Sequence, residues 1–200
     1  MVEFITNRKI YEKVICGAIP SANSFVWLAT SDLKDLYVEK GRKKMVPFLE
    51  TLNDLLIKGV KVRLIHAKEP GAAFHKDFAR YPELAKGLER LLCPRIHFKS
   101  VVVDGKFAYS GSANLTGAGM GAKSESRRNF ESGFITSERK LINQIAEQFD
   151  DLWMGKFCKA CQRKQFCTNS GEMIYVPIAQ EQVIICHSPL RYLITSRGCN

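Results

Sequence analysis

The sequence predicts an α/β domain built of packed layers, and three observations lead to that prediction. Short apolar, β-rich segments alternate with longer amphipathic segments over the first three quarters of the chain, which is typical of a sheet covered by helices. The chain has 200 residues, enough for one good-sized domain with its own core. With 46% hydrophobic and 25% charged residues, the composition is that of a globular protein and excludes collagen-like and wholly disordered chains.

The first half of the domain is expected to alternate strands and helices. Residues 24–29, SFVWLA, are short, apolar and β-rich and predict a strand. Residues 45–58 place leucine and phenylalanine on one helical face and end before Gly59, so they predict an amphipathic helix. Residues 60–67 predict a second buried strand, and residues 82–92, with four leucines facing inward, predict a second helix.

A β-hairpin is expected to open the second half. Two β-rich runs, residues 95–104 and 106–112, are joined at an Asp-Gly pair that suits the positive φ angles of a tight turn. After a basic loop rich in Gly and Ser, residues 130–136 predict a further strand. Ser137 is then expected to cap a helix whose apolar face ends at Trp153.

The composition changes near residue 155, which divides the chain into two predicted parts. Residues 1–154 are expected to form the main domain, and residues 155–200, rich in Cys, Lys and Gln, a small appended module. No apolar run approaches the ~18 residues of a membrane span. The start of the chain carries charges where a signal peptide has an apolar core, so we expect a cytoplasmic protein without stable membrane association.

The strongest chemical signal lies on the predicted hairpin. The segment HFKSVVVD has the spacing His-x-Lys-x-x-x-x-Asp, formed by His97, Lys99 and Asp104, and a Gly-Ser-x-Asn segment with Ser112 and Asn114 follows it. Side chains two apart on a strand point to the same face, so His97 and Lys99 are expected to share one phosphate. An imidazole can attack phosphorus while an ammonium group offsets the oxyanion charge, and neither role needs a metal. Ser112 and Asn114 share a face of the neighbouring strand and are expected to bind the same phosphate.

On these residues the chain resembles the phospholipase D superfamily, whose signature joins this spacing to a Gly-Ser-x-Asn segment. The resemblance covers about three quarters of the chain, from about residue 8 to residue 154. It implies a mixed β-sheet flanked by helices and a metal-independent phosphodiesterase that forms a phosphohistidine on His97. It also implies that Asp104 is a structural residue and that a later acidic residue orients the imidazole. Glu131 is the candidate for that role, and the alternative is a solvated carboxylate at the end of a strand.

A single copy of the motif predicts a homodimer. The two-step reaction needs a nucleophile on one side of phosphorus and a general acid on the other, and the chain holds one histidine in such a motif. A two-fold dimer would supply the second histidine and build one shared active site. The resemblance implies the same, because single-motif members of the superfamily build such shared sites.

The charge of the chain favours a polyanionic partner. Thirty Lys and Arg against 20 Asp and Glu give a net charge of +10. Nucleic acid is the first candidate and anionic phospholipid the second. The same charge also fits a non-catalytic nucleic-acid-binding module, or a basic protein whose charges are only solvated. With no amphipathic anchor and no lipidation signal, we expect a nuclease acting on DNA or RNA. The basic residues expected to bind nucleic acid are Lys123, Arg127, Arg128, Lys40, Arg42, Lys43 and Lys44.

Three thiols within ten residues predict a metal site in the C-terminal module. Cys158, Cys161 and Cys167 contain the Cys-x-x-Cys spacing typical of zinc and iron–sulfur sites. We expect a closed, structural zinc ion or [4Fe–4S] cluster, and no cofactor for catalysis. The fourth ligand is expected to be Cys186, the nearest downstream candidate, with the alternatives His187, Cys199 and Cys93.

Overall fold

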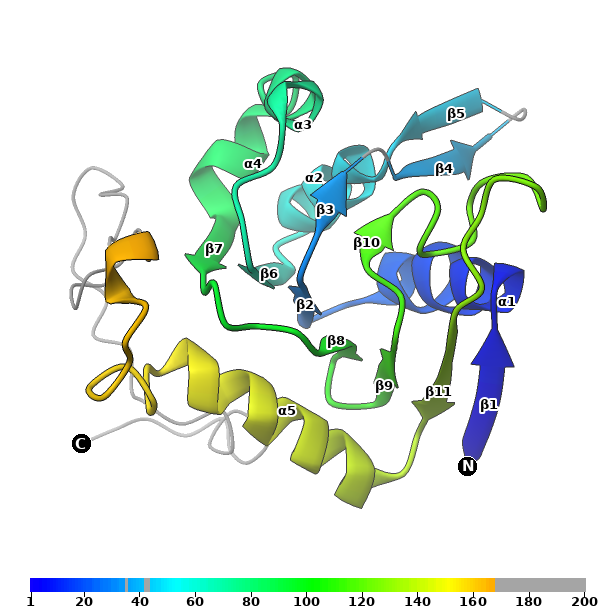
Figure 1. Ribbon diagram of the computed structural model, residues 1–200. Helices are drawn as coiled ribbons and strands as arrows, with labels where there is room; N and C mark the ends of the chain where they lie inside the picture. The colour runs from blue at the N-terminus through cyan, green and yellow to red at the C-terminus, as the bar shows by residue number, and fades with distance from the viewer. Residues whose placement is uncertain (35, 42–43, 168–200) are drawn as a thin grey trace, which may run out of the picture.

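One mixed sheet of seven strands forms the middle layer of the computed structural model, which describes residues 1–34, 36–41 and 44–167 (Figure 1). The strands lie in the order β1-β11-β9-β8-β2-β6-β7. Their bounds are β1 Val2–Thr6, β2 Phe25–Thr30, β6 Lys61–His66, β7 Leu88–Leu92, β8 Lys99–Val103, β9 Phe107–Gly111 and β11 Ser132–Thr136.

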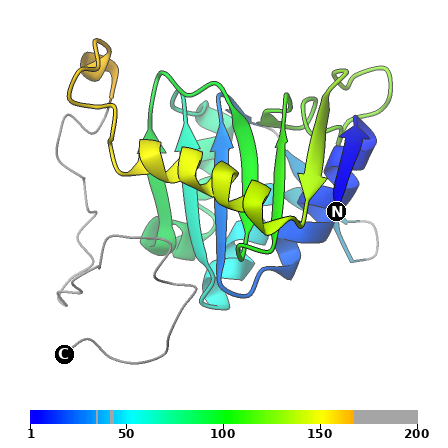
Figure 2. The same ribbon diagram turned by 90° about the horizontal axis from the view of Figure 1, so that it is seen from below.

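The strand directions bring several strand ends to one edge of the sheet. Strands β2, β6 and β7 are parallel to one another, whereas β8, β9, β11 and β1 continue the sheet in antiparallel pairs. The carboxyl ends of β2, β6, β7 and β9 therefore meet the amino ends of β8 and β11. We call this edge the carboxyl edge; it lies at the top of Figure 2. Ligand sites of open α/β sheets commonly lie at the carboxyl ends of parallel strands.

Most of the helices cover one face of the sheet. Alternation along the strands turns Val26 and Leu28 of β2 toward this face, where they join the larger hydrophobic cluster with Val14 and Leu52. Two small two-stranded sheets, β3 with β10 and β4 with β5, accompany these helices. The bounds are α1 Arg8–Ile10, η1 Tyr11–Ala18, η2 Ile19–Ser21, β3 Leu33–Lys34, β4 Tyr37–Lys40, β5 Lys44–Pro47, α2 Phe48–Ile57, α3 Ala72–Phe78, α4 Pro82–Gly87 and β10 Leu115–Thr116.

Helix α5 (Arg139–Trp153) crosses the opposite face of the sheet, as Figure 2 shows. It buries Ile142 and Phe149 against a second hydrophobic cluster. The ring of Phe149 stacks on that of Trp27 with centroids 5.0 Å apart. Strand β2 is thus covered on both faces, which explains why its sequence is continuously apolar rather than alternating.

Two predicted helices are shorter than the sequence indicated. Residues 45–47 belong to strand β5, and α2 begins only after Pro47, whose backbone is extended (φ −57°, ψ 141°). Residues 88–92 form strand β7, which pairs in parallel with β6, while α4 ends at Gly87. A short apolar run fits a buried strand as well as a helix, and only the neighbouring strand decides between them.

Other expectations on the ends of the domain need correction or lie outside the described residues. Ser137 does not cap α5. Glu138 holds the N-cap position, and its N–H donates to Oγ1 of Thr136 at 3.0 Å. Strand β1 and the helical segments α1, η1 and α3 were not predicted. Of the C-terminal module, the structure describes residues 155–167, with one short helical turn, η3 (Lys164–Phe166).

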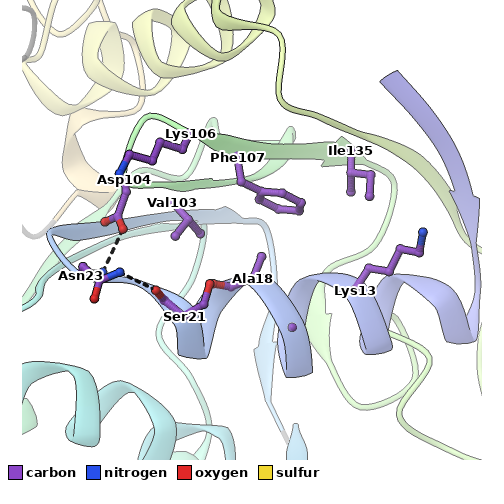
Figure 3. Close-up of a pocket in the computed structure, with 10 residues that line it drawn as sticks. Lys13, Ala18, Ser21, Asn23, Val103, Asp104, Lys106, Phe107 and Ile135 are labelled. Carbon is purple, nitrogen blue, oxygen red and sulfur yellow. Dashed lines mark hydrogen bonds between the residues drawn. The ribbon is translucent and has the colours of Figure 1, made fainter. Parts of the chain in front are cut away.

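The predicted hairpin is present, and Asp104 holds its turn. Asp104 and Gly105 have φ of +53° and +62°, the positive values that a tight hairpin turn requires. The Asp104 carboxylate accepts hydrogen bonds from the backbone N–H groups of Asn23, Ser24 and Phe25 at 2.9, 2.8 and 2.8 Å. Figure 3 shows Asp104 pointing to Asn23 beside a surface hollow of about 540 Å³. This end of β8 is opposite to the end that begins at Lys99, so the hollow is remote from the motif histidine.

We expect Asp104→Ala to lower the free energy of unfolding by about 1–3 kcal/mol, because three backbone donors lose a charged acceptor. Urea unfolding followed by circular dichroism measures the loss. Glu147→Gln, at an exposed position of α5, is the control and is expected to change stability by less than about 0.5 kcal/mol. If the two variants unfold at the same urea concentration, the anchoring role of Asp104 is wrong.

Candidate active site

The motif residues gather at the carboxyl edge of the sheet, where β8 begins and β9 ends. Lys99 is the first residue of β8 and pairs with Gly111, the last residue of β9. His97 lies in the segment of residues 93–98 that connects β7 to β8. The sequence predicted that His97 belongs to the strand. That prediction was wrong, because β2, the neighbour of β8, ends at Thr30 and offers no further pairing there.

The backbone at His97 is held firmly while its side chain is exposed. Ile96 is buried in the second hydrophobic cluster, and its carbonyl accepts a hydrogen bond from Ser31 Oγ at 3.3 Å. The Nζ group of Lys99 donates to the carbonyl oxygen of His97 at 2.5 Å. The imidazole itself makes no hydrogen bond with any other described residue. A ring so placed is free to meet a ligand from solvent.

Lys99 is a buried cation at the centre of the site. Its side chain is only 6% exposed. Burial lowers the pKa of the Lys99 ammonium group, and the nearby carboxylate of Glu131 acts in the opposite direction. A charge that water screens so little acts strongly on an anion brought next to it.

Glu131 and Ser112 form a hydrogen-bonded pair beside Lys99. Ser112 Oγ donates to one carboxylate oxygen of Glu131, and Asn129 Nδ2 donates to the other at 3.1 Å. The backbone N–H of Glu131 is held in turn by Asn7 Oδ1 at 2.9 Å. Within the described chain, Glu131 thus bonds to Ser112 and Asn129, and no hydrogen bond joins it to His97. Because a hydroxyl has one proton, Ser112 donates to Glu131 here rather than to a ligand.

Asn114 shapes the end of β2. Its Oδ1 accepts hydrogen bonds from the N–H groups of Ser31 and Asp32, at 3.1 and 3.2 Å, and from Thr30 Oγ1 at 3.2 Å. Its amide nitrogen has no partner among the described residues and is available as a donor. The side chain therefore fixes the scaffold through its oxygen and offers its nitrogen to a ligand.

Two lysines beside Asn114 were not singled out in the sequence. Asp32 follows β2, and its carboxylate lies 3.2 Å from the ammonium groups of both Lys34 and Lys68. Burial opposes ionisation of Asp32, but the two lysines outweigh it and lower the pKa of the carboxyl group. The lysine side chains are 61% and 64% exposed, so they add positive charge at this edge. The position of Asp32 directly after a buried strand was the one available signal.

The glycine of the Gly-Ser-x-Asn segment is required by close packing. Gly111 pairs with Gly133 across β9 and β11. A Cβ on Gly111 would lie 2.5 Å from the carbonyl oxygen of Ser132 and would also strike the Tyr109 hydroxyl. A Cβ on Gly133 would lie 2.6 Å from both the Ser110 carbonyl oxygen and the ring of Tyr109. The two glycines thus let β9 and β11 approach each other beneath Ser112.

The basic residues expected to bind nucleic acid differ in whether acidic side chains neutralise their charge. Lys40 is paired with Glu50 and Asp54 at 2.7 and 2.6 Å, and both hydrogen bonds raise the pKa of its ammonium group. Lys44 is exposed at the start of β5, and Arg42 and Lys43 lie outside the described residues. The group around Lys40 is therefore partly neutralised by acidic side chains of α2.

The second basic group lies on the loop that leads into Glu131. Arg127 Nε donates to Ser124 Oγ at 3.2 Å, and Arg128 lies 3.6 Å from Glu125. Lys123, on the same loop, also has an interaction partner within the chain. The loop leads to Glu131, which accepts a hydrogen bond from Ser112, so the loop ends at the carboxyl edge. Of the two predicted basic groups, the group on this loop is the one connected to the site by a hydrogen bond.

The predicted metal ligands are only partly described. Cys158, Cys161 and Cys167 follow α5 as free thiols, whereas Cys186 lies outside the described residues. In residues 1–167, apart from 35, 42 and 43, no three His, Cys, Asp or Glu side chains stand in an arrangement that could hold a metal ion.

Comparisons with known proteins agree on the family of this fold. A family model described as "Cardiolipin synthase, PLD-like domain" matches residues 15–153. A mitochondrial cardiolipin hydrolase of Chlamydomonas reinhardtii is 28% identical over 97 residues, which are 48% of this chain and 41% of that protein. The chain thus spans less than half the length of that relative.

Two solved structures share the fold over most of the chain. Nuc from Salmonella typhimurium, a phospholipase D family member, has a TM-score of 0.57 at 18% identity, covering 76% of this chain and 93% of its own. NucT from Helicobacter pylori has a TM-score of 0.56 at 14% identity, covering 84% and 98%. At these identities the likeness shows the fold alone.

The burial of Lys99 predicts an unusual pH dependence of anion binding. Because its pKa is lowered, the ammonium group loses its charge at a lower pH than an ordinary lysine would. We expect affinity for inorganic phosphate, measured by calorimetry, to fall with rising pH, already within the range below about pH 10.4 in which an ordinary lysine keeps its charge.

Lys99→Arg should extend tight phosphate binding to higher pH, because a guanidinium keeps its charge there. Lys106→Arg, at the remote hairpin turn, should leave the pH profile unchanged. Phosphate affinity that stays constant across this range in the unmodified protein would contradict a role for the Lys99 charge.

Proposed function

This chain belongs to the phospholipase D superfamily, and on that premise we propose that it is a cytoplasmic, metal-independent nuclease that acts as a homodimer. One observation carries the proposal. An exposed imidazole, His97, stands on a backbone held by the buried ammonium group of Lys99, beside Ser112, Glu131 and the free amide nitrogen of Asn114. These are the groups needed to bind a phosphodiester and attack its phosphorus atom.

The first step forms a covalent intermediate on His97. An unprotonated ring nitrogen attacks phosphorus, and the bond from phosphorus to the leaving oxygen breaks. The partner's His97, in its protonated form, gives its proton to that oxygen. Lys99 and the Asn114 amide offset the negative charge on the other phosphate oxygens.

Water completes the cycle in the second step. The partner's His97 is now neutral and takes a proton from a water molecule that attacks phosphorus. The bond between phosphorus and the His97 nitrogen breaks, and both histidines return to their starting states. Because each chain supplies one such histidine, the cycle requires two chains around one phosphate.

The surface around the site favours a nucleic acid as substrate. The net charge of the chain is +10, and Lys34 and Lys68 flank the end of β2. Phe130, next to Glu131, is 94% exposed. An aromatic ring beside phosphate-binding groups suits the stacking of an unpaired base.

An anionic phospholipid is the second candidate substrate. The matching family model carries the description "Cardiolipin synthase, PLD-like domain", and the relative from Chlamydomonas reinhardtii is named a mitochondrial cardiolipin hydrolase. Cardiolipin is itself a phosphodiester with negative charge, so the same basic edge would attract it. In the described part of the chain, no helix is both long and apolar enough to cross a membrane.

The substrate is tested by giving the purified protein labelled oligonucleotides or cardiolipin vesicles in excess chelator. We expect nucleic-acid cleavage that falls steeply as salt rises, and no release of lipid products. His97→Ala should reduce cleavage by at least about a thousandfold, since it removes the nucleophile. His75→Ala, on the exposed face of α3, is the control and should cleave normally. Lipid hydrolysis without nucleic-acid cleavage would favour the second candidate. The absence of both activities would contradict the proposal that the protein is a phosphodiesterase.

The shared site is tested with heterodimers of one unmodified chain and one His97→Ala chain. Co-expression with two different affinity tags allows these heterodimers to be purified. We expect their activity to be about a hundredth of that of the unmodified dimer or less, because one of the two histidines is missing. Heterodimer activity near one half of that of the unmodified dimer would mean that each chain holds a complete site. An active protein that sediments as a monomer would mean the same.

A further inference from the structure

Two lysines from distant parts of the sequence converge on one carboxylate at the carboxyl edge. Lys34 belongs to β3, and Lys68 follows the end of β6. The Nζ atoms of the two lysines lie 3.2 Å from different carboxylate oxygens of Asp32. Two positive charges thus meet one negative charge, which leaves an excess of one positive charge at this point. An anion that joins the three side chains would relieve the repulsion between the two ammonium groups.

The main chain that carries Asp32 and Lys34 is fixed next to the motif residues. The backbone N–H of Asp32 donates to Asn114 Oδ1 at 3.2 Å, and the Asp32 carbonyl accepts a hydrogen bond from Thr30 Oγ1 at 2.7 Å. Lys34 pairs with Thr116 where β3 runs beside β10. The segment is therefore attached on both sides to residues that adjoin Asn114, whose amide nitrogen is proposed to bind the scissile phosphate.

A buried histidine fixes the main chain at Lys68. His66 is the last residue of β6 and is 1% exposed. Its Nδ1 lies 2.8 Å from the carbonyl oxygen of Lys68, which can only accept, so Nδ1 carries the proton. Its Nε2 lies 3.3 Å from Nη2 of Arg90, which can only donate, so Nε2 is the acceptor and the imidazole is neutral. Burial favours the same state, because it lowers the pKa of His66.

The residue after Lys68 is held as well. Arg90 Nη2 donates to both carboxylate oxygens of Glu69, at 3.0 and 2.7 Å. Lys68 thus stands between a carboxylate fixed by Arg90 and a carbonyl fixed by His66, while Asp32 directs its ammonium group. A lysine on a freely moving loop would lack all three of these constraints.

The two ammonium groups are directed by Asp32 and are also open to solvent. More than half of each lysine side chain is exposed, as given above. An ammonium group has three hydrogen-bond donors, and the carboxylate oxygen beside it can occupy only part of them. Binding an anion usually orders a flexible lysine side chain at a cost in entropy. Because Asp32 already restricts Lys34 and Lys68, less entropy is lost when an anion binds between them.

We propose that Lys34 and Lys68, positioned by Asp32, form a second phosphate-binding site, which holds the phosphate next to the scissile one in a nucleic-acid strand. The inference rests on the proposed function, because it names a further contact to the same substrate. A nucleic acid carries phosphates at regular intervals, so a strand attacked by His97 brings a neighbouring phosphate to this edge. Contacts of this kind fix the register and direction of the strand without reading its bases.

The test measures binding of a labelled single-stranded oligonucleotide to the chain carrying His97→Ala, which leaves the strand uncleaved. Fluorescence anisotropy gives the affinity between about 0.1 and about 0.3 M salt, where distant charges are largely screened. We expect Lys34→Gln with Lys68→Gln to lower the affinity at least about tenfold. The slope of log affinity against log salt should become shallower by about 0.7, the value for one phosphate of a single strand. Lys34→Arg with Lys68→Arg should retain affinity and slope, because both charges remain.

The matched control is Lys58→Gln with Lys140→Gln, which removes the same amount of charge from two other exposed positions. Lys58 lies between α2 and β6, at the edge of the sheet opposite to the site, and Lys140 lies in the first turn of α5. This pair should change the affinity by less than about twofold, because its charges are screened from the bound strand. Both double variants should keep their circular dichroism spectra, since all four side chains are exposed.

Equal affinity and equal salt dependence of the two glutamine double variants would overturn the second phosphate site. A His97→Ala protein that does not bind the oligonucleotide would overturn it too. Cardiolipin vesicles provide a further arm: if the Lys34 and Lys68 variant loses vesicle binding but keeps its oligonucleotide affinity, the two lysines serve a lipid surface and the proposal is wrong. Cleavage is measured separately with His97 intact, so an inactive protein that still shows the lysine effect refutes the proposed nuclease and not this site.

Discussion

The buried ammonium group of Lys99 is the constraint on which the arrangement of the site depends. Removing a charge from water is unfavourable unless hydrogen bonds and an opposite charge compensate it. In this chain the compensation comes from the carbonyl oxygen of His97 and the carboxylate of Glu131. Glu131 is in turn held by Ser112, Asn129 and Asn7. The start of β8, the end of β9 and the start of β11 are therefore positioned by one charge.

Two other residues of the motif hold strand β2 at its two ends. The Asp104 carboxylate accepts hydrogen bonds from the backbone N–H groups that lead into β2. The side-chain oxygen of Asn114 accepts them from the backbone N–H groups that follow β2. The hairpin of β8 and β9 is thereby locked in register with the parallel half of the sheet. Within one short motif, Asp104 and the side-chain oxygen of Asn114 build the scaffold, while His97, Lys99 and the side-chain nitrogen of Asn114 are the groups that we propose to bind the ligand.

The sequence predicted best what is determined locally. The apolar runs of β2 and β8 are buried on both faces, and the Asp-Gly turn has its own conformational signature, so the sequence predicts both. For residues 88–92 the leucine spacing predicts a helix, whereas their pairing with β6, which is distant in the sequence, makes them a strand. The same reason applies to the partners of Glu131 and to Lys34 and Lys68. These depend on loops that meet only after the sheet has formed.

The hydrogen bond between Ser112 and Glu131 joins a residue expected to bind phosphate to the residue expected to orient His97. The Ser112 hydroxyl has a single proton, which it donates to Glu131. When a phosphate offers its own oxygen, Ser112 can turn its proton to it, and one oxygen of Glu131 is then left without that donor. The exposed imidazole of His97 has no hydrogen-bond partner among the described residues. The residue expected to hold the histidine, Glu131, instead accepts hydrogen bonds from Ser112 and Asn129.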